Sequence, residues 1–529
     1  MEIFHITKKT TLIIAVAIFF VIFSNFSFYK NVLSVYPLTL KNIGFLASLG
    51  IVLINGIIIL FTLLCSKITT KPVLIFFVLL TSLTSYFMDS YGVVIDYTMI
   101  DNLVKTDMAE SLDLLSFKLG LYFLFFGVLP SVYIYQTNIN YQPFTTELFS
   151  GFKRVIISPL IVIAVALPCS NFYASFIREH KPLRYYTNPT YYIFSVIKYI
   201  NEQLKIDSNI PMAALGLDAY IPETGTGREL IILVVGETAR ADKFSLNGYS
   251  RKTNPYLEKE QVISFSDFYS CGTTTAVSVP CMFSHLSRSD FSNAKARQTE
   301  NLLDVLTHAG VNVLWRDNNS DSKGVALRVD YQSFKTEEKN TICDDECRDV
   351  GMLVGLQDYI AQHKQGDIFI VLHQMGNHGP AYYKRYPKSF ERFKPTCLTN
   401  QLEDCTVEAI GNTYDNVILY TDYFLSEVIK FLKLNSEEFE TAMFYISDHG
   451  ESLGENGLYL HGLPYMMAPN NQIHVPAVMW FGEGFKVNEA LVASRRAKKY
   501  SHDNIYHTVL GFMEIETESY NKELDILNQ

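Results

Sequence analysis

Polar residues suited to binding a metal follow three apolar runs in the C-terminal part of the chain. Glu237 follows LIILVV (230–235), Asp448 and His449 follow TAMFYI (441–446), and His373 and His378 follow DIFIVL (367–372). If these runs are parallel strands, their carboxyl ends meet at the sheet edge where ligands of open α/β sheets bind. Carboxylates and imidazoles together are ligands that Zn²⁺ accepts. These residues therefore predict a zinc site, with His461 in LHGLP as a further candidate that spacing alone does not select.

Three consecutive threonines could supply a reacting group for such a site. Thr273, Thr274 and Thr275 stand in CGTTTAVSVPC (271–281), a loop that leads into an expected helix. A helix N-terminus favours anions, and a metal lowers the pKa of a coordinated hydroxyl and so makes it a nucleophile. The alternative is that these threonines only cap the helix. Physical chemistry alone does not choose among the three.

The elements around these residues predict an α/β domain. The three runs and VNVLW (311–315) are mostly apolar without alternation, which is typical of strands buried on both faces. Helical stretches at 298–309, 350–364 and 408–434 lie between them. Strand–helix alternation of this kind predicts a largely parallel central sheet.

The N-terminal third is predicted to lie in a membrane. Its five apolar runs are each long enough, or nearly so, to cross a hydrocarbon core of ~30 Å. One such run could be a buried core helix, but five within 175 residues argue against that reading. The first is not a cleaved signal peptide, because four more follow it and no small-residue cleavage site closes it. The runs lie near 11–29, 43–65, 72–88, 119–135 and 155–176.

The orientation follows from basic residues, which favour the cytoplasmic side of a membrane. Five crossings then put everything after residue 176 outside. The basic residues that define this orientation are Lys8 and Lys9 before the first run, Lys67 and Lys71 between the second and third, and Lys153 and Arg154 at the start of the fifth.

Cysteine usage supports the same orientation. Six of the eight cysteines fall in close pairs, and only one pair has a spacing near that of zinc fingers. Three short-range disulfides in an oxidising compartment fit the pattern better than a zinc site. Cys65 and Cys169 lie in apolar runs and are expected to behave as small hydrophobic residues outside any disulfide. The predicted disulfides are Cys271–Cys281, Cys343–Cys347 and Cys397–Cys405.

Two segments connect these regions. In the loop 90–118, Asn102, Thr106 and Glu110 recur every four residues, so a helix would carry all three on one face; a solvated face is the simpler interpretation. The tyrosine-rich segment 185–205 is typical of a helix at a membrane interface. We therefore expect a transmembrane domain at 1–176, an interfacial helix and linker at 177–229, and a periplasmic catalytic domain at 230–529.

Net charge excludes one class of partner. The chain carries a net charge of −10, which arises after residue 175, because residues 1–175 hold ten lysines and arginines against eight acids. An acidic soluble part lacks the basic footprint that nucleic-acid binding needs. We expect no nucleic-acid partner.

Four longer strings closely resemble the phosphoethanolamine transferases that modify lipid A, a group that includes the mobile colistin-resistance enzymes. The resemblance covers nearly the whole chain, including five spans, an outward domain and the three cysteine pairs. It implies an α/β domain of the alkaline-phosphatase/sulfatase type after a five-helix transmembrane domain. The strings are VVGETARAD (234–242), YSCGTTTAVSVPCMFS (269–284), HQMGNHGPAYY (373–383) and ISDHGESLGENGLYLHG (446–462).

The resemblance also implies roles for individual residues. Thr275 matches the nucleophile that becomes covalently modified, and with Glu237, Asp448 and His449 it matches the ligands of a tightly held zinc. His378 and His461 match residues that bind a second, weaker zinc or the transferred phosphate, and His373 lies nearby in the sequence. Further matches are Ser320 and Lys323 as substrate contacts, and Asn102, Thr106 and Glu110 as the face that holds the ethanolamine head group.

The implied reaction has phosphatidylethanolamine as donor and a lipid A phosphate of lipopolysaccharide as acceptor. The enzyme would work as a monomer at the periplasmic face of a bacterial inner membrane, with zinc as cofactor and diacylglycerol as by-product. A cationic ethanolamine on lipid A would lower the surface charge that attracts cationic peptides, so the resemblance also implies polymyxin and colistin resistance.

Four alternatives compete with this reading. The nearest is the same transfer onto core heptose, Kdo or a surface protein. A glycerophosphate transferase of the lipoteichoic-acid type also combines five spans with an outward α/β domain, but the cysteine pairs and the threonine string argue against it. A sulfatase requires a Cys-x-Pro-x-Arg string, which the sequence lacks. A non-enzymatic receptor would make the ligand-type residues at several strand ends accidental.

Overall fold

The computed structural model describes residues 6–105, 108–204, 211–222 and 227–528 and divides into two compact units. The helical unit comprises Met1–Ile100 and Leu115–Tyr199, and the α/β unit comprises Asp101–Leu114 and Ile200–Gln529. The segment Asp101–Leu114 therefore belongs with the α/β unit, although it lies within the N-terminal third of the chain.

The helical unit contains helices that can cross a membrane. By length and composition, four described helices qualify, and the pair α1 (Lys9–Phe23) and α2 (Phe26–Val35), bent by 55°, provides a fifth if it forms one span. Each apolar run of the sequence falls in one of these five. The other four spans are α3 (Ile43–Leu64), α4 (Thr70–Tyr91), Phe117–Gln136 and Phe144–Arg178. Phe117–Gln136 consists of α7 (Phe117–Phe123), a π-helical turn and α8 (Leu129–Gln136), and Phe144–Arg178 consists of α9 (Phe144–Ala166), a 3-10 turn and α10 (Ser170–Arg178).

The surface of the helical unit is apolar where a water-soluble protein would be polar. Phe144 and Phe149 on α9 are 80% and 71% exposed, as expected when hydrocarbon is the surrounding solvent. Its interior is packed around fully buried side chains such as Phe20 and Phe61. Two buried asparagines there satisfy each other, as polar groups need in a medium without water: the Asn188 N–H donates to Asn25 Oδ1 at 2.8 Å, and Asn25 Nδ2 donates to the Asn188 carbonyl oxygen at 2.9 Å.

The connecting segments are helical in part. The predicted interfacial helix corresponds to α11 (Thr190–Leu204). The loop 90–118 contains α5 (Tyr97–Lys105), which carries Asn102, and α6 (Met108–Asp113). Thr106 and the side chain of Glu110 lie outside the described residues.

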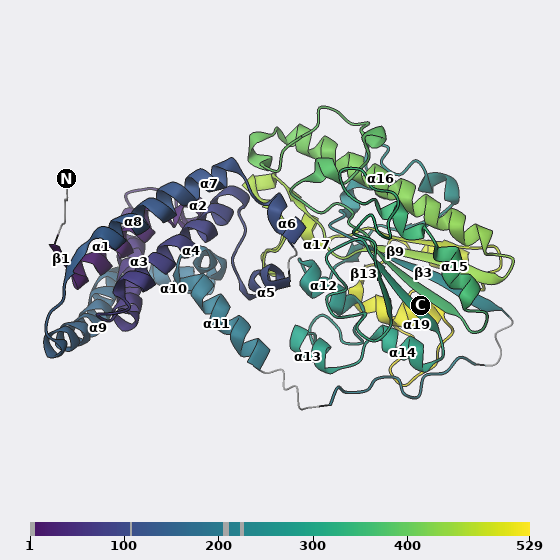
Figure 1. Ribbon diagram of the computed structural model, residues 1–529, viewed down its shortest axis with the longest axis horizontal. Helices are drawn as coiled ribbons and strands as arrows, with labels where there is room; N and C mark the ends of the chain where they lie inside the picture. The colour runs from purple at the N-terminus through teal and green to yellow at the C-terminus, as the bar shows by residue number, and fades with distance from the viewer. Residues whose placement is uncertain (1–5, 106–107, 205–210, 223–226, 529) are drawn as a thin grey trace. The chain divides into compact units, whose positions relative to one another are not determined.

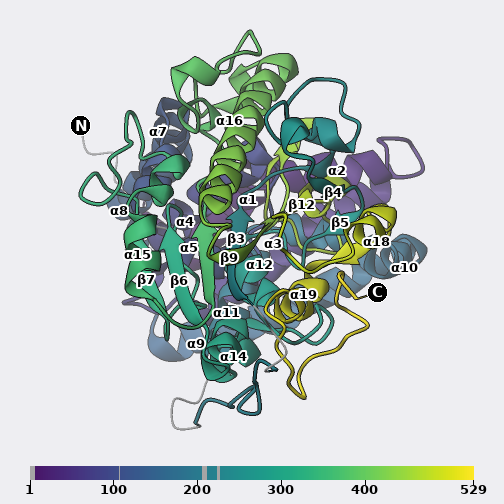
Figure 2. The ribbon, with the colours of Figure 1, turned by 90° about the vertical axis from the view of Figure 1, so that its right-hand side faces the viewer.

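A seven-stranded sheet forms the centre of the α/β unit, in the order β4-β12-β9-β3-β8-β6-β7. Five of its strands are parallel, and β12 runs antiparallel to both β9 and β4. Figure 2 shows β6 and β7 to one side of β3 and β9, and β12 and β4 to the other. The strands are β3 (Arg228–Gly236), β4 (Ile263–Phe265), β6 (Asn312–Asp317), β7 (Asp330–Ser333), β8 (Ile368–His373), β9 (Phe439–Ser447) and β12 (Ala477–Phe481).

Helices cover both faces of this sheet, which explains the unbroken apolar runs in its strands. Ile231 and Leu233 of β3 pack into one core with α12, α14 and α19, while Leu230 and Ile232 pack into a second core with α15 and α16. Figure 1 shows α16 on one side of β3 and β9, and α14 and α19 on the other. The helices are α12 (Thr275–Met282), α14 (Leu302–His308), α15 (Leu356–Gln362), α16 (Val407–Leu434) and α19 (Ile505–Phe512).

The predicted fold class is therefore correct, and the four predicted strands are β3, β6, β8 and β9. The antiparallel strand β12 and the short edge strands β4 and β7 were not predicted from the sequence. Since β3 and β9 are parallel neighbours with Gly236 opposite Ser447, the residues after both strands emerge at the same sheet edge.

Candidate active site

Glu237, Asp448 and His449 meet at this sheet edge. One ligand atom from each lies within 4.8 Å of the others, and all three side chains are completely buried. His449 Nε2 lies 3.4 Å from Glu237 Oε1 and 3.3 Å from Asp448 Oδ2. Two carboxylates and an imidazole thus converge on one point with no access for bulk water.

The ring of His449 is held in one tautomer. Its Nδ1 lies 3.0 Å from the carbonyl oxygen of Gly450, which can only accept, so Nδ1 carries the proton. Burial, with the neighbouring His461 adding to it, holds the pKa of His449 well below its ordinary value. The ring is therefore neutral, and the lone pair of Nε2 faces the two carboxylates, as a metal ligand requires.

Only one of the two carboxylate oxygens of Asp448 is hydrogen-bonded within the described chain. Its Oδ1 accepts hydrogen bonds from the backbone N–H groups of Thr238 (3.1 Å) and His449 (2.7 Å). Its Oδ2 is buried and has no hydrogen-bond partner among the described residues. Burial, and then the charge of Glu237, raise the pKa of Asp448 well above its ordinary value. A divalent cation would satisfy the free oxygen and offset the repulsion between the carboxylates, so the donor set fits a metal ion.

The structure distinguishes the three threonines, which sequence reasoning could not. Thr275 Oγ1 lies 3.1 Å from Glu237 Oε2 and 3.5 Å from His449 Nε2. Thr273 instead donates its hydroxyl hydrogen to the carbonyl oxygen of Leu463, at 2.7 Å. Thr274 occupies the N-cap position of α12, and its buried hydroxyl has no hydrogen-bond partner in the described chain. Only Thr275, the first residue of α12, joins the carboxylate–imidazole cluster.

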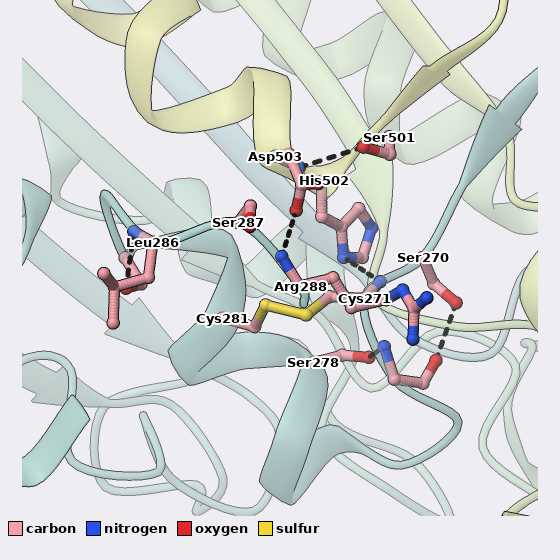
Figure 3. Close-up of a disulfide and its surroundings, with 12 residues drawn as sticks. Ser270, Cys271, Ser278, Cys281, Leu286, Ser287, Arg288, Ser501, His502 and Asp503 are labelled. Carbon is pink, nitrogen blue, oxygen red and sulfur yellow. Dashed lines mark hydrogen bonds between the residues drawn. A yellow bond between two sulfur atoms is a disulfide. The ribbon is translucent and has the colours of Figure 1, made fainter. Parts of the chain in front are cut away.

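Figure 3 shows the Cys271–Cys281 disulfide and its surroundings, which hold the threonine loop, the segment 271–275 that carries the three threonines. The Cys271–Cys281 disulfide ties the start of the loop to the end of α12, and the Gly272 N–H donates to Ser278 Oγ at 3.0 Å. The Cys271 N–H donates to Nδ1 of His502 at 3.1 Å, and His502 Nε2 in turn donates to the carbonyl oxygen of Ser447 at 3.0 Å. His502 therefore links the loop that carries Thr275 to the strand end that carries Asp448 and His449.

Neighbouring backbone and side chains fix Glu237. Asn319 donates from Nδ2 to Glu237 Oε2 at 2.9 Å and to the carbonyl oxygen of Gln374 at 2.8 Å. Gly376 has φ of +50°, and a Cβ there would lie 2.9 Å from the Glu237 carbonyl oxygen, so only glycine fits. Thr238 has φ of +51°, a strained value for a β-branched residue, and strain of this kind concentrates at functional sites.

The three further histidines lie in different surroundings. The ring centroid of His461 lies 4.3 Å from that of His449 and 6.0 Å from that of His378, so these two candidates border the cluster. Burial alone would lower the pKa of His461, but the Glu451 carboxylate, 3.4 Å away, raises this pKa above its ordinary value.

His373 lies apart from that group in its contacts. Its Nδ1 pairs with Asp317 Oδ2 at 2.9 Å, and its Nε2 is buried without a hydrogen-bond partner in the described chain. Burial alone would raise the pKa of Asp317, but the neighbouring His373 lowers it below its ordinary value.

Two of the predicted substrate contacts, Ser320 and Lys323, lie at or beside a cavity of about 380 Å³. Ser320 lines this cavity, and Lys323 Nζ donates to the carbonyl oxygen and the hydroxyl of Ser320, both at 2.8 Å. Asn319 and His378 also line it, so the cavity adjoins the carboxylate–imidazole cluster. Its other lining residues include Asp113, Lys335, Glu346, Lys384 and Arg385.

All three predicted disulfides are present, namely Cys271–Cys281, Cys343–Cys347 and Cys397–Cys405. Cys65 and Cys169 are free, as predicted.

Several residues around the site escaped sequence reasoning. Asn319 follows β6 by two residues, so the rule about strand ends would have found it had it been applied to that strand. Glu451 stands in the string that already supplied Asp448 and His449, but nothing in the sequence shows that it faces His461. His502 is 231 residues from Cys271, its hydrogen-bond partner, and no local signal marks it.

Comparisons with known proteins agree with this architecture. A family model described as phosphoethanolamine transferase EptA/EptB matches residues 53–204, and one described as sulfatase matches residues 229–515. The chain is 41% identical to phosphatidylethanolamine transferase Mcr-1 of Escherichia coli over 96% of this chain and 95% of that one. It is 40% identical to phosphoethanolamine transferase EptA of E. coli K12, over 95% and 93%.

A solved structure covers both units. It is the integral membrane lipooligosaccharide phosphoethanolamine transferase A (EptA) of Neisseria meningitidis, which is 34% identical and superposes with a TM-score of 0.94 over 98% of each chain.

Proposed function

Because this chain belongs to the phosphoethanolamine transferase family, we propose that it moves phosphoethanolamine from phosphatidylethanolamine to a phosphate of lipid A, with Thr275 as the covalent carrier. The protein is a multi-pass protein of the bacterial inner membrane, and its catalytic domain is periplasmic. The observation that carries the proposal is the Thr275 hydroxyl, 3.1 Å from Glu237 inside the buried cluster.

We propose that Glu237, Asp448 and His449, with Thr275, hold one zinc ion tightly. The neutral His449, the unpartnered oxygen of Asp448 and the two repelling carboxylates support this assignment. When bound, the ion supplies Lewis-acid chemistry, which lowers the pKa of a hydroxyl and offsets developing negative charge on phosphate oxygens. His378 and His461 would hold a second, weaker zinc or the transferred phosphate, with His373, whose Nε2 has no partner in the described chain, as a further candidate.

In the first half-reaction, the Thr275 oxygen attacks the phosphorus of phosphatidylethanolamine. A bond forms between Thr275 Oγ1 and phosphorus, and the bond from phosphorus to the glycerol oxygen breaks. The Thr275 proton passes to a neighbouring base, for which Glu237 is positioned at 3.1 Å. The leaving glycerol oxygen takes up a proton, with His461 or His378 as donor, and diacylglycerol departs.

In the second half-reaction, an oxygen of a lipid A phosphate attacks the same phosphorus. The new bond joins the two phosphates and the bond to Thr275 breaks. Thr275 regains its proton from Glu237, and the attacking phosphate gives its own proton to the histidine that protonated the diacylglycerol. Because the enzyme returns to its starting state only after both substrates have reacted, the scheme is ping-pong. The α12 N-terminus favours the anionic group at Thr275 throughout.

The remaining predicted residues would hold the head groups. Ser320 and Lys323 would contact phosphate oxygens, and Asn102, Thr106 and Glu110 would contact the ethanolamine, whose ammonium suits a carboxylate. A membrane anchor serves this chemistry, because moving lipid chains into water costs ~0.8 kcal/mol per CH₂ group. We accordingly propose the division into 1–176 as anchor, 177–229 as interfacial connector and 230–529 as catalytic domain.

Mass spectrometry of lipid A tests this function. We would express the full chain in a susceptible lipopolysaccharide-bearing host beside a Thr275→Ala variant, and verify that both are in the membrane. We expect one added phosphoethanolamine on lipid A and raised polymyxin resistance with the wild type, and neither with the variant. Unchanged lipid A with the wild type would move the acceptor to core heptose, Kdo or a surface protein. Modification that survives in Thr275→Ala would exclude Thr275 as the carrier.

A further inference from the structure

Five cationic side chains line a second cavity in the α/β unit, of about 280 Å³. This concentration runs against the composition of a chain whose net charge is −10. Met212, Leu286 and Leu327 contribute apolar surface to the same wall, and Leu327 is 75% exposed. We call this space the cationic cavity; its cations are Lys105, Lys295, Arg297, Lys323 and Arg328.

Nearby carboxylates neutralise only part of this charge. Asp304 accepts two hydrogen bonds from Arg328, and Asp101 lies 2.7 Å from Lys105 Nζ. Asp101 is also 3.4 Å from an Arg297 nitrogen, so it is shared between two cations. Glu300, the acid among the described residues of the cavity wall, pairs with His308 and accepts a hydrogen bond from the backbone N–H of Leu215.

Two of the cations contact only neutral oxygens among the described residues. Lys295 Nζ donates to the carbonyl oxygen of Asp290 at 2.6 Å. Lys323 Nζ donates to Ser320 and, at 3.5 Å, to the carbonyl oxygen of Lys105. Among the described residues, five cations thus face three carboxylates, which leaves an excess of positive charge there.

The cations also repel one another. Burial lowers the pKa of the Lys105 ammonium, Asp101 partly opposes this, and the charges of Arg297 and Lys323 lower it further. An anion placed among these side chains would relieve the repulsion and could receive charge-assisted hydrogen bonds from both lysine and arginine.

The cationic cavity is linked by contacts to the transfer centre, by which we mean Thr275 with Glu237, Asp448 and His449. Asn293 in its wall donates from Nδ2 to the carbonyl oxygen of Ala276, the residue next to Thr275, at 3.3 Å. Lys323 in the same wall is bonded to Ser320, which lines the cavity beside Glu237 and His378. The turn from Ser320 to Lys323 therefore contributes to two cavities, and a wall residue of each contacts the active site: Asn293 contacts Ala276, and Asn319 contacts Glu237.

We propose that the cationic cavity binds the second phosphate of the acceptor glycolipid while its reacting phosphate lies at Thr275. The inference rests on the proposed function and adds a recognition site to it. Lipid A carries two phosphates on one disaccharide, whereas the zwitterionic donor has a single phosphate, which must itself lie at Thr275. The apolar wall suits an amphiphile better than a free phosphate ion.

Kinetics with two acceptors test this site. We would compare lipid A that carries two phosphates with monophosphoryl lipid A, using the full-length enzyme in nanodiscs and a Lys295→Gln/Arg297→Gln double variant. We expect the double variant to raise KM for the two-phosphate acceptor about tenfold, because two partly exposed contacts to one phosphate are lost. KM for the monophosphoryl acceptor, and kcat for both, should change less than about twofold.

Two controls separate this effect from others. Diacylglycerol release from phosphatidylethanolamine without acceptor should be unchanged in the double variant, because Lys295 and Arg297 are not among the residues proposed to contact the donor. A Lys388→Gln/Lys430→Gln variant removes the same charge from side chains that are 76% and 57% exposed, and should leave every parameter unchanged. The increase of KM should shrink at high salt.

Three results would overturn the inference. An equal change of KM for both acceptors would mean that the lysine and arginine act on charge in general. Slower diacylglycerol release in the double variant would assign the cavity to the donor. Competition by phosphatidylglycerol in wild-type nanodiscs, lost in the double variant, would assign it to an anionic phospholipid. Failure of the proposed function looks different, since the wild type would then modify neither acceptor.

Discussion

The transfer centre and the cationic cavity are two charged regions of one domain, built in opposite ways. Glu237, Asp448 and His449 are completely buried, and each is oriented by backbone or side-chain partners. In the cationic cavity, Arg297 and Arg328 keep 35% and 32% of their side-chain surface exposed. Under the proposed roles, the buried region carries out the chemistry and the partly exposed region recognises the acceptor.

Burial decides how strongly each region should respond to change. Charges without water around them interact strongly and cannot be screened by salt, whereas exposed pairs contribute little and are screened. We therefore expect large effects on kcat from the transfer centre and small, salt-dependent effects on KM from the cationic cavity.

The largest effect is expected from Glu237→Gln. The substitution keeps the shape of the side chain but removes a charge that faces Thr275 and His449. We expect kcat to fall about 10³-fold or more and bound zinc to be lost. The matched control is Glu229→Gln at the other end of the same strand, which should keep full activity. If both substitutions lowered kcat equally, the loss at Glu237 would reflect folding rather than chemistry.

Metal removal should have the next largest effect. Dialysis against a chelator should lower transfer about 100-fold and lower the Tm of the α/β unit by several degrees, because two repelling buried carboxylates lose their counter-charge. Both tryptophans, Trp315 and Trp480, lie in this unit, so their fluorescence reports its unfolding. Adding zinc back should restore both. An unchanged Tm after verified metal loss would contradict the assignment of the cluster as a metal site.

A smaller effect is expected at His502, which positions the threonine loop. Burial lowers the pKa of His502 to about 3, so the ring is neutral at working pH and acts through its two hydrogen bonds. His502→Phe should lower kcat about tenfold with little change in KM, since Thr275 shifts relative to Asp448 and His449. His502→Gln keeps an acceptor and a donor and should recover part of the loss. If the Phe and Gln variants have the same kcat, His502 does not act through its hydrogen bonds.

The smallest effect concerns stability at Glu229. Burial raises the pKa of Glu229 to about 9, with three neighbouring carboxylates adding to it, and its Oε2 has no hydrogen-bond partner among the described residues. Since the folded-state pKa lies above the ordinary value, the folded protein binds the proton more tightly, and stability falls as pH rises from about 5 to 9. Glu229→Gln should raise Tm by a few degrees at pH 8 and by less at pH 5. A gain that is independent of pH would contradict this account.

Much of the site could be predicted because strand ends are local features. The runs before Glu237 and Asp448 are apolar throughout, which indicates burial on both faces, and parallel strands bring their ends together. The five apolar runs and the cysteine pairs were equally visible. Family resemblance, rather than pattern, chose Thr275, and the structure now gives a reason, since Thr273 and Thr274 have other surroundings.

What the sequence could not reveal depends on contacts between distant residues. His502 reaches Cys271 across 231 positions, and the cationic cavity collects Lys105, Lys295 and Lys323 from separate segments. β12 (AVMWF) has the apolar pattern of a buried strand, yet nothing local states that it runs antiparallel. Such features follow from the whole chain packing at once.

The most direct test of the account is where phosphoethanolamine becomes attached to the enzyme. Full-length protein would be incubated with phosphatidylethanolamine without acceptor, digested, and the modified peptide from residues 269–284 sequenced by mass spectrometry. We predict phosphoethanolamine on Thr275, none on Thr273 or Thr274, and its loss when lipid A is added. Modification of another residue, or transfer to lipid A by Thr275→Ala, would contradict the central claim.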